Sequence, residues 1–583
     1  MKNKLTSFFT KLTVKLWQSL KRFPLPVLMA ASTVILIIVL NHLPQNTLES
    51  TRDLVARIAL VFALGFPLFL SINVFLEGRS QIKTSTKNLI LFSGSVILAL
   101  YFVFLFSKLD STSGIRYSIY TGVLYLMFLY IPKTFKKESY ELYVVKLFTS
   151  FVTVLLYSII LFIGVAAIIG STVLLFKLSI SGEIYIDIAT IIFGLIAPVL
   201  FLSEIPAYET ILYLESYPKV LKILFLYIIL PILSIFLVIF YLYFATILFK
   251  PWPSNIIFRI AFYFLITSIV ALFFTYPLTV TNKWGKVFTS IYPKLLLPLV
   301  VLMFMSLWIR LSNYGVTNSR YFLVIAAIWI AFSLIYLSLN INPKNIILLI
   351  SLSILLFLSA TGPWNFSQVT KMSQSEIFKN IIVKYDMLLQ GKVQKSSKEI
   401  NLEDKVTLTS ILNYYENHYD LKGLNYLPVD FSMDKMKDVF GFEPEYYQGY
   451  NNTGANHQYY NSGNQNNILN IKDYDYIITI FNSSEEETLI TKDAMEIILK
   501  KSDLIIKNNG KTLYNKNLSE LAGKIYSNKN DKNMLTTEEL TIKDGNENLD
   551  VVYVFDNLDL SKDLNSNIIQ IYSMNLKLLV KFH

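Results

Sequence analysis

Cysteine is absent from this 583-residue sequence, which excludes disulfides, cysteine nucleophiles and thiolate metal ligands. Glycine-rich phosphate loops, nucleophile elbows and kinase signatures are also missing. Histidine is scarce, and its four copies stand far apart without the spacing of a metal site: His42, His418, His457 and His583. We therefore expect neither a metal nor a cofactor, and the sequence gives little support to an enzyme.

Negative charge is scarce in the N-terminal part of the chain. Residues 365–583 hold 24 Lys and Arg against 30 Asp and Glu, so 28 and 11 of the total 52 and 41 fall in residues 1–364. The excess of basic residues is thus confined to the first part, where it flanks apolar runs as in membrane proteins. A nucleic-acid-binding protein would need a basic face with interleaved aromatic residues, which is not visible here.

Long apolar runs dominate the same N-terminal part. The whole chain is 54% hydrophobic, with a mean hydropathy of +0.48. Runs of about 18 residues or more with few charges are long enough to cross a bilayer. The fold expected is therefore an all-α polytopic transmembrane bundle of about eleven helices, followed by a small α+β extracytoplasmic domain. The predicted spans are 25–42, 55–76, 88–107, 115–132, 145–173, 184–203, 221–249, 256–278, 291–310, 321–339 and 344–361.

Loop charge predicts the orientation of these spans. With the N-terminus in the cytoplasm, the cytoplasmic loops and span flanks hold 19 Lys and Arg, and those outside hold 7. This asymmetry follows the positive-inside rule. An odd number of spans then places residues 362–583 outside the cytoplasm. The richness in Ile, Lys, Asn and Tyr suggests an AT-rich bacterial genome, so we predict a multi-pass protein of the bacterial plasma membrane.

The tail after the last span changes character. Residues 373–390 and 402–418 show the periodicity of amphipathic helices, with Gly391 as a C-cap for the first. Residues 443–468 are rich in Asn and Tyr and are predicted to form a flexible loop. Strand-like runs and one helix follow, at 473–481, 503–508, 518–526 (the helix), 550–555 and 567–582. The predicted parts are a basic amphipathic N-terminal segment (1–24), the transmembrane bundle (25–361), a membrane-exit motif with a helical stalk (362–425) and a soluble α+β domain (426–583).

Three segments are similar to a known family. The first is YPKVLKILFLYIILPILSIFLVIFYLYFATIL (217–248), with Lys219, Tyr227, Pro231, Tyr241, Tyr243 and Phe244. The second is WIRLSNYGVTNSRYF (308–322), with Trp308, Arg310, Tyr314, Gly315, Thr317, Arg320 and Tyr321. The third is GPWNFSQVTKMSQ (362–374), with Gly362, Pro363, Trp364, Phe366, Ser373 and Gln374. Together they resemble the bacterial polytopic membrane proteins that share domain of unknown function 4153. The resemblance implies a membrane location and a trailing soluble part, and it implies no activity.

The second of these segments is the first candidate site. As a simple hinge, Gly315 would end one helix in a left-handed conformation and Thr317 would cap the next. As a functional site, Arg310, Tyr314 and Arg320 would bind anions such as lipid headgroups or polymer phosphates at the outer face. A third possibility is that this turn contacts the C-terminal tail.

Two further candidates lie at opposite ends of the predicted bundle. Residues 203–219 are interpreted as an amphipathic helix on the inner face, which carries an acidic cluster of Glu204, Glu209 and Glu215. These carboxylates either bind a cation or protons, or form a solvated face. After the last span, Gly362, Pro363 and Trp364 form either a rigid membrane-exit anchor or a hinge between the tail and the bundle.

The function expected is that of a non-enzymatic cell-envelope component. The lipid bilayer is its environment, and its soluble tail would bind an envelope protein or a wall polymer. The alternative is a permease or lipid-handling transporter, since prolines interrupt several spans. No carboxylate near the membrane midplane accompanies those prolines, which weakens the transport hypothesis. The prolines are Pro67, Pro198, Pro231 and Pro298.

Overall fold

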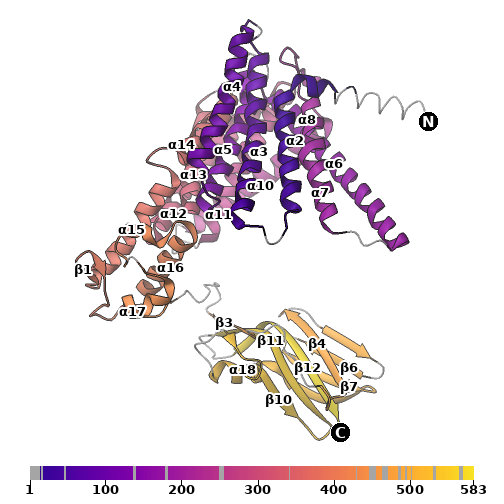
Figure 1. Cartoon of the computed structure of the whole chain (residues 1–583), viewed down its shortest axis with the longest axis vertical. Coiled ribbons are helices and arrows are strands. Elements are labelled where there is room, and N and C mark those ends of the chain that lie inside the picture. Colours follow the sequence, from indigo (N-terminus) through magenta and orange to yellow (C-terminus); the bar gives the residue numbers. More distant parts are fainter. Residues whose placement is uncertain are drawn as a thin grey trace. The chain divides into compact units, whose positions relative to one another are not determined.

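The computed structural model divides the chain into two compact units, Met1–Glu443 and Pro444–His583. We describe each unit by itself (Figure 1). The structure describes the whole chain except residues 1–13, 15–16, 45–46, 80, 135–139, 178–180, 248–254, 341, 429, 446–454, 463–470, 484–487, 493–494, 501, 529–533 and 564–568.

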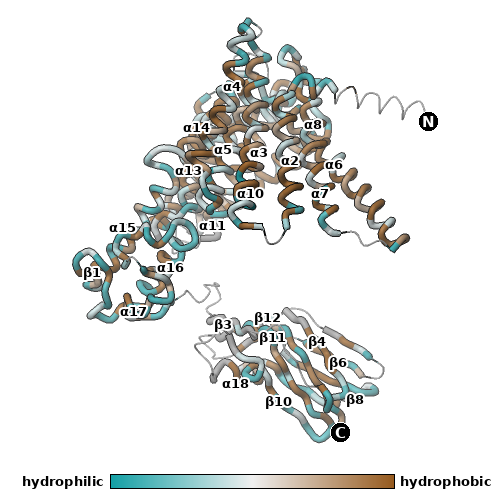
Figure 2. Tube along the Cα trace, in the orientation of Figure 1, coloured by the Kyte–Doolittle hydropathy of each residue, from teal (hydrophilic) through white to brown (hydrophobic). Residues whose placement is uncertain are grey.

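The first unit is a bundle of long apolar helices (Figure 1), and its hydrophobic stretches stand out along the helices in Figure 2. Among the described residues, ten helical segments are long and apolar enough to cross a membrane. This confirms the predicted polytopic bundle. The ten segments are formed by α2 (Pro24–Asn41), α3 (Glu49–Glu77), α4 (Thr84–Leu100), α5 (Ser111–Tyr130), α6 (Tyr140–Phe176), α7 (Glu183–Ile191) together with α8 (Ala197–Ser203), α9 (Lys219–Ile223) together with α10 (Leu230–Ile247), α11 (Asn255–Thr275), α12 (Lys283–Tyr314) and α13 (Asn318–Leu339). Helix α14 (Ile346–Ala360) is shorter and is not one of the ten.

The eleventh predicted span corresponds to α14, which has 15 residues. It runs antiparallel to α13, because Tyr336 near the end of α13 bonds Lys344, and the Trp329 indole donates to the Leu348 carbonyl. Just after α14, the Trp364 carbonyl accepts a hydrogen bond from Tyr321 at the start of α13. The chain therefore leaves the bundle at the end where α13 begins, which we call the exit end.

The opposite end of the bundle gathers the N-terminal side of α2 and several loops. Arg22, just before α2, pairs with Glu77 at the end of α3 (2.7 Å) and donates to the Ile205 carbonyl after α8 (2.6 Å). The start of α6 lies at this end too, because Lys146 pairs with Glu204 at 3.6 Å. The first described turn of α2 and the exit of the chain therefore lie at opposite ends of the bundle.

Within the described residues, three spans contain π-helical turns, at Tyr101–Leu105, Ile192–Ile196 and Leu224–Ile229. The π-helical turn Leu224–Ile229 ends two residues before Pro231, one of the prolines that interrupt the predicted spans. Proline cannot donate the backbone bond that an α-helix needs, so the preceding turn is free to widen. In the π-helical turn Ile192–Ile196, Gly194 allows close packing on α2, because a Cβ there would collide with Val34.

The prediction of an amphipathic helix over residues 203–219 is wrong. Helix α8 ends at Ser203, and the next helical residues are a single 3₁₀ turn at Leu214–Ser216. Pro206 and Pro218 explain the difference, since proline lacks the backbone N–H and disfavours helical conformation in the residue before it.

After α14 the chain forms the stalk, a small helical layer within the first unit. Helices α15 (Phe366–Lys384) and α16 (Leu402–His418) are capped by Asn365 and Asn401, whose side chains accept backbone N–H groups. Gly391 is not a helix cap as predicted, because α15 ends at Lys384 and Gly391 lies in the turn between short strands β1 (Leu388–Leu389) and β2 (Lys392–Val393). Residues up to Glu443 pack with this layer, beyond the boundary predicted after residue 425.

Among its described residues, the second unit contains two sheets and one helix, α18 (Leu518–Asn528), which confirms the predicted α+β class. Its strand pairs are antiparallel except for β3 and β9, which pair in parallel. One sheet has the order β4-β12-β11-β3-β9 with β10 beside β11, and the other is the meander β5-β6-β7-β8. Both sheets and α18 share one core. The strands are β3 (Ala455–Ser462), β4 (Tyr476–Ser483), β5 (Thr488–Lys492), β6 (Met495–Lys500), β7 (Asp503–Asn508), β8 (Lys511–Asn517), β9 (Met534–Leu535), β10 (Thr541–Gly545), β11 (Leu549–Asp563) and β12 (Ile569–Phe582).

Part of the predicted flexible loop 443–468 is a strand. Residues Ala455–Ser462 form β3, which pairs antiparallel with β11 over seven residue pairs. Residues 446–454 and 463–468 lie outside the described residues. The low strand propensity of Asn and Gln is outweighed here by backbone pairing with the long strand β11, a tertiary effect that local composition does not contain.

Candidate functional site at the membrane-exit junction

The turn between α12 and α13 lies at the exit end of the bundle. Gly315 ends α12 with a φ of +63°, a conformation that glycine adopts without strain. Thr317 occupies the N-cap position of α13, but its side chain makes no capping bond. The first N–H of the helix, from Asn318, is instead accepted by the hydroxyl of Tyr414 on α16 at 2.8 Å. The stalk thus caps a membrane helix.

Helix α15 satisfies the backbone of the same turn. The Val316 N–H donates to the Ser373 hydroxyl at 2.9 Å, and the Val316 carbonyl accepts from the Gln374 amide at 3.0 Å. Gln374 is buried, so these bonds are shielded from water. Helix α15 lies so close to this turn that a Cβ on Gly315 would collide with the Ile377 side chain.

Tyrosines of the α16 region complete the contact, which we call the junction. The Tyr419 hydroxyl donates to the Asn318 side chain of α13 at 2.5 Å. Within the stalk, the Tyr415 hydroxyl donates to the Lys371 carbonyl at 2.9 Å and so joins α16 to α15. Burial raises the pKa of Tyr415 to about 12 and also raises that of Tyr419. Both hydroxyls therefore remain protonated donors near neutral pH.

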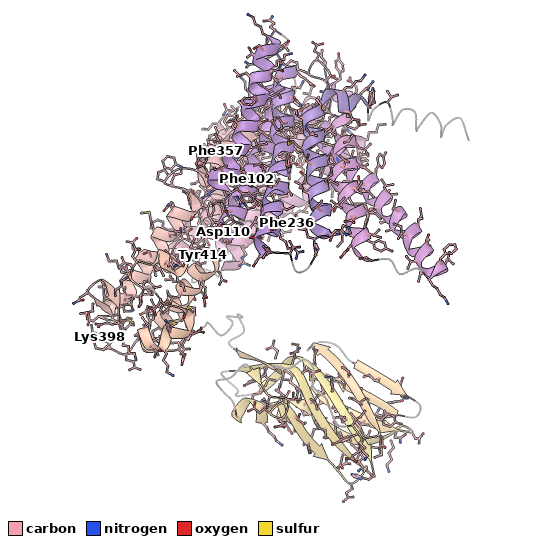
Figure 3. All side chains as sticks on the ribbon, in the orientation of Figure 1. Phe102, Asp110, Phe236, Phe357, Lys398 and Tyr414 are labelled. Carbon is pink, nitrogen blue, oxygen red and sulfur yellow. The ribbon has the colours of Figure 1, made fainter. Side chains whose placement is uncertain are left out.

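The junction also touches α5. The Thr112 hydroxyl donates to the His418 carbonyl at 3.1 Å, just after Asp110 caps the first turn of α5. Figure 3 labels Asp110 and Tyr414 on the two helices that this bond joins. The stalk therefore contacts more than one membrane helix.

The membrane-exit residues lie beside this contact. Gly362 has a φ of +79°, and its carbonyl accepts the Asn365 amide at 2.6 Å. Trp364 is 55% exposed, yet its carbonyl is bonded by Tyr321 at 2.7 Å. The exposed indole suits an interfacial anchor, and the bonded backbone ties the exit to α13. A role of Gly362, Pro363 and Trp364 as an anchor or a hinge stays a prediction.

The arginines of the turn have different roles. Arg320 donates to the Gly315 carbonyl at 3.0 Å and so stabilises the end of α12. Arg310 is half-buried one turn earlier on α12. The side chain of Tyr314 lies outside the described residues. An anion site formed by these three residues stays a prediction.

The acidic candidates lie at the opposite end of the bundle. Glu204 is half-buried and pairs with Lys146, whereas Glu209 and Glu215 are exposed in the loop that follows α8. Since the segment is not helical, the three carboxylates do not share a helical face. A cation or proton site in this cluster remains a prediction.

A model of the family described as domain of unknown function (DUF4153) matches residues 27–392. The chain belongs to the DUF4153 family. No curated protein and no solved structure matches the sequence. Two segments that resemble DUF4153 proteins, 308–322 and 362–374, meet at the junction through the bonds of Val316 with Ser373 and Gln374.

Sequence reasoning missed the tyrosines of α16 within the DUF4153 chain. These tyrosines lie in the stretch NYYENHYD (413–420), where no candidate site was placed from the sequence. Tyr415 and Tyr419 are four residues apart, which places them on one side of a helix. That spacing, in a segment predicted to follow the last span, is the signal that could have identified them.

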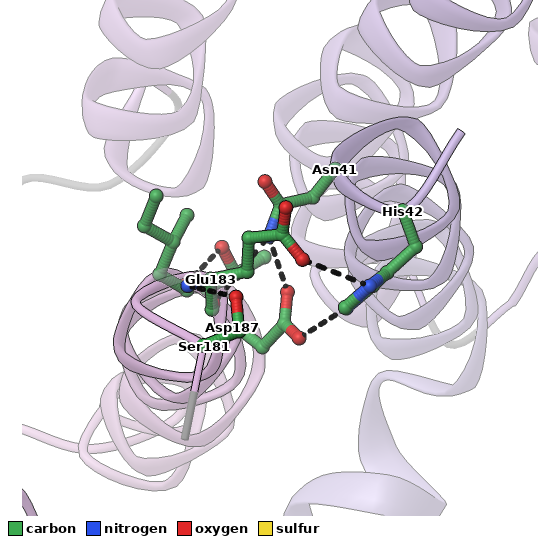
Figure 4. A network of polar contacts seen from close by, with 7 residues as sticks. Asn41, His42, Ser181, Glu183 and Asp187 are labelled. Carbon is green, nitrogen blue, oxygen red and sulfur yellow. Dashed lines mark hydrogen bonds and ion pairs between the residues drawn. The ribbon is translucent and has the colours of Figure 1, made fainter. Parts of the chain in front are cut away.

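A second polar network at the exit end joins α2 to α7 (Figure 4). His42 lies between two carboxylates, with Nε2 at 2.6 Å from Asp187 and Nδ1 at 3.5 Å from Glu183. Asn41 also donates to Asp187 at 2.9 Å. The hydrogen bond and charge of Asp187 raise the pKa of His42, with a smaller contribution from Glu183. This contact, which we call the histidine latch, is favoured when the imidazole is protonated.

Proposed function

We propose that this protein is a non-enzymatic component of the bacterial cell envelope, whose tail binds an envelope protein or wall polymer outside the cytoplasm. The observation that supports the proposal is the junction, which holds the stalk against the bundle through backbone bonds at Val316 and Asn318. A stalk fixed to the bundle is a firm base for the unit that follows it in the chain. The second unit, Pro444–His583, is the part of the tail that would carry the binding surface.

Binding by the tail can be tested with two forms of the protein. Full-length protein and a form that ends after Glu443 would be purified in detergent and incubated with isolated cell-wall polymer and with solubilised envelope proteins. We expect the full-length protein to be retained and the shortened form to lose retention. Equal retention of both forms contradicts a binding role for the tail.

The side on which the tail lies is a separate part of the proposal. Because the chain lacks cysteine, single cysteines report topology without background labelling. Lys398 is exposed in the stalk, and Lys344 is exposed between α13 and α14. We expect an impermeant maleimide to label Lys398→Cys on intact cells and to label Lys344→Cys after permeabilisation. The reverse pattern places the tail in the cytoplasm and refutes the proposed orientation.

A permease or lipid-handling protein is the second candidate. The π-helical turns at Tyr101–Leu105, Ile192–Ile196 and Leu224–Ile229 support it, since such turns are frequent at functional sites. Reconstituted vesicles would be assayed for solute flux and for lipid scrambling, with protein-free vesicles as the control. Flux or scrambling that depends on the protein favours this candidate over a purely anchoring role.

A further inference from the structure

Arg116 is an unusual residue for its position. It lies five residues after the start of α5, within a helix long and apolar enough to cross a membrane. At a rise of 1.5 Å per residue, this places its backbone roughly 8 Å below the exit end of the helix. A cation at such a depth is costly unless it is paired or reaches the headgroup level.

One donor of the Arg116 guanidinium is left without a hydrogen-bond partner in the described part of the chain. This donor is Nε, which is buried. Tyr101 is only 6% exposed, and its hydroxyl likewise finds no partner within the described chain. The Arg116 Nε–H and the Tyr101 hydroxyl are therefore two buried donors without an acceptor among the described residues.

The guanidinium of Arg57, another arginine within a membrane-spanning helix, does have hydrogen-bond partners. Arg57 on α3 donates from Nε to the Phe106 carbonyl at 2.7 Å and lies over the Phe102 ring at 4.7 Å. Its positive charge thus meets the carbonyl end of α4 and its π-helical turn, where the helix dipole favours a cation. Arg116 lies near the start of α5, where a cation gains nothing from the dipole.

The surroundings of Arg116 are aromatic. Tyr101 packs edge-on against Tyr120 at 5.8 Å, and Phe106 stacks on both Tyr101 (5.6 Å) and Tyr117 (5.8 Å). Tyr120 follows Arg116 by one helical turn on α5, so both side chains lie on the same side of the helix, and Tyr101 packs against Tyr120. The two unsatisfied donors therefore belong to one cluster, formed by the end of α4 and the start of α5.

We propose that Arg116 and Tyr101 bind the phosphate of an anionic lipid headgroup. A guanidinium offers parallel N–H donors that match two phosphate oxygens, and a phenol adds a further donor. Arg116 is partly exposed on a membrane-spanning helix, so the groups that reach it are those of the surrounding lipid. The site is distinct from the junction and does not depend on the function proposed above.

The test is a lipid titration of the purified protein by native mass spectrometry. Phosphatidylglycerol is added in one series and phosphatidylcholine in another, and Arg116→Gln is compared with wild type. We expect Arg116→Gln to weaken binding of one phosphatidylglycerol roughly tenfold, the size of a lost charge-assisted hydrogen bond. Tyr101→Phe, which removes one hydroxyl, should weaken it less. Equal phosphatidylglycerol binding by Arg116→Gln and wild type overturns the proposal.

Two controls make the result specific. Arg52→Gln removes an exposed arginine from the first turn of α3 at the same end of the bundle, and it should leave lipid binding unchanged. Inorganic phosphate at millimolar concentration should not displace the lipid, and full displacement assigns the site to a dissolved anion instead. If Arg116→Gln does not fold, Arg116→Lys keeps the charge without the planar fork and should still weaken binding several-fold. Unchanged affinity in a folded Arg116→Lys, together with unchanged affinity in Tyr101→Phe, also overturns the proposal.

Discussion

The junction and the histidine latch lie at the same end of one bundle and are held by different kinds of interaction. At the junction, serine, glutamine and tyrosine side chains bond backbone groups of Val316 and Asn318. At the latch, a histidine is held between carboxylates on a neighbouring helix. Neutral hydrogen bonds fix a geometry over a wide pH range, whereas a histidine pair depends on pH. The attachment of the stalk should therefore not change with pH, whereas the stability of the α2–α7 contact should.

Gly315 should give the largest effect, because it combines a positive φ with close packing. Gly315→Ala forces a side chain into a strained conformation and against Ile377, so we expect a loss of about 2–4 kcal/mol in the free energy of unfolding. Denaturant unfolding of the detergent-solubilised protein measures it. Gly391→Ala is the matched control, since Gly391 has a φ of +81° with open space around its Cβ. Equal losses in both variants would show that packing at the junction contributes nothing.

A smaller effect is expected from Tyr419→Phe. The substitution removes the hydroxyl that donates to Asn318 and leaves the ring in place, so the loss should be about 0.5–1.5 kcal/mol. Hydrogen exchange of the α13 N-terminus should rise together with that loss. Tyr426→Phe serves as the comparison, because Tyr426 contributes mainly its ring, which stacks on Phe378. An effect of Tyr426→Phe as large as that of Tyr419→Phe would argue against the hydrogen bond.

The sequence predicted the helix break at Gly315 because its cause is local. Glycine between two apolar runs marks a helix end whatever the rest of the chain does. The cap of α13 was assigned to Thr317, but Tyr414, nearly one hundred residues away, supplies the acceptor. A prediction from local sequence assigns the cap to the nearest hydroxyl, because it contains no information on the packing of α16 against α13. The strand Ala455–Ser462 was missed for the same reason, since its partner β11 follows about one hundred residues later.

The histidine latch should respond to pH while the junction does not. Because interaction with Asp187 raises the pKa of His42 from 6.5, protonated His42 stabilises the folded contact. The contribution is fully present below pH 6.5 and is lost as the pH rises through the raised pKa. Hydrogen exchange at the end of α2 should therefore increase from pH 6 to pH 9 after correction for intrinsic rates. His42→Gln should remove this dependence, and a corrected profile that stays flat in wild type would contradict the latch.

Substitutions of Arg310 and Arg320 give the smallest expected effects. They distinguish a purely structural turn from an anion-binding site. Arg320→Gln removes a bond to the Gly315 carbonyl and should cost about 0.5–1 kcal/mol, whereas Arg310→Gln should leave the free energy of unfolding within about 0.5 kcal/mol of wild type. Thermal and denaturant unfolding of both variants measure this difference. If Arg310 takes part in an anion site, Arg310→Gln should instead weaken binding of an anionic polymer without changing stability. Equal stability and equal polymer binding in Arg310→Gln would leave the turn with the structural role that Arg320 performs.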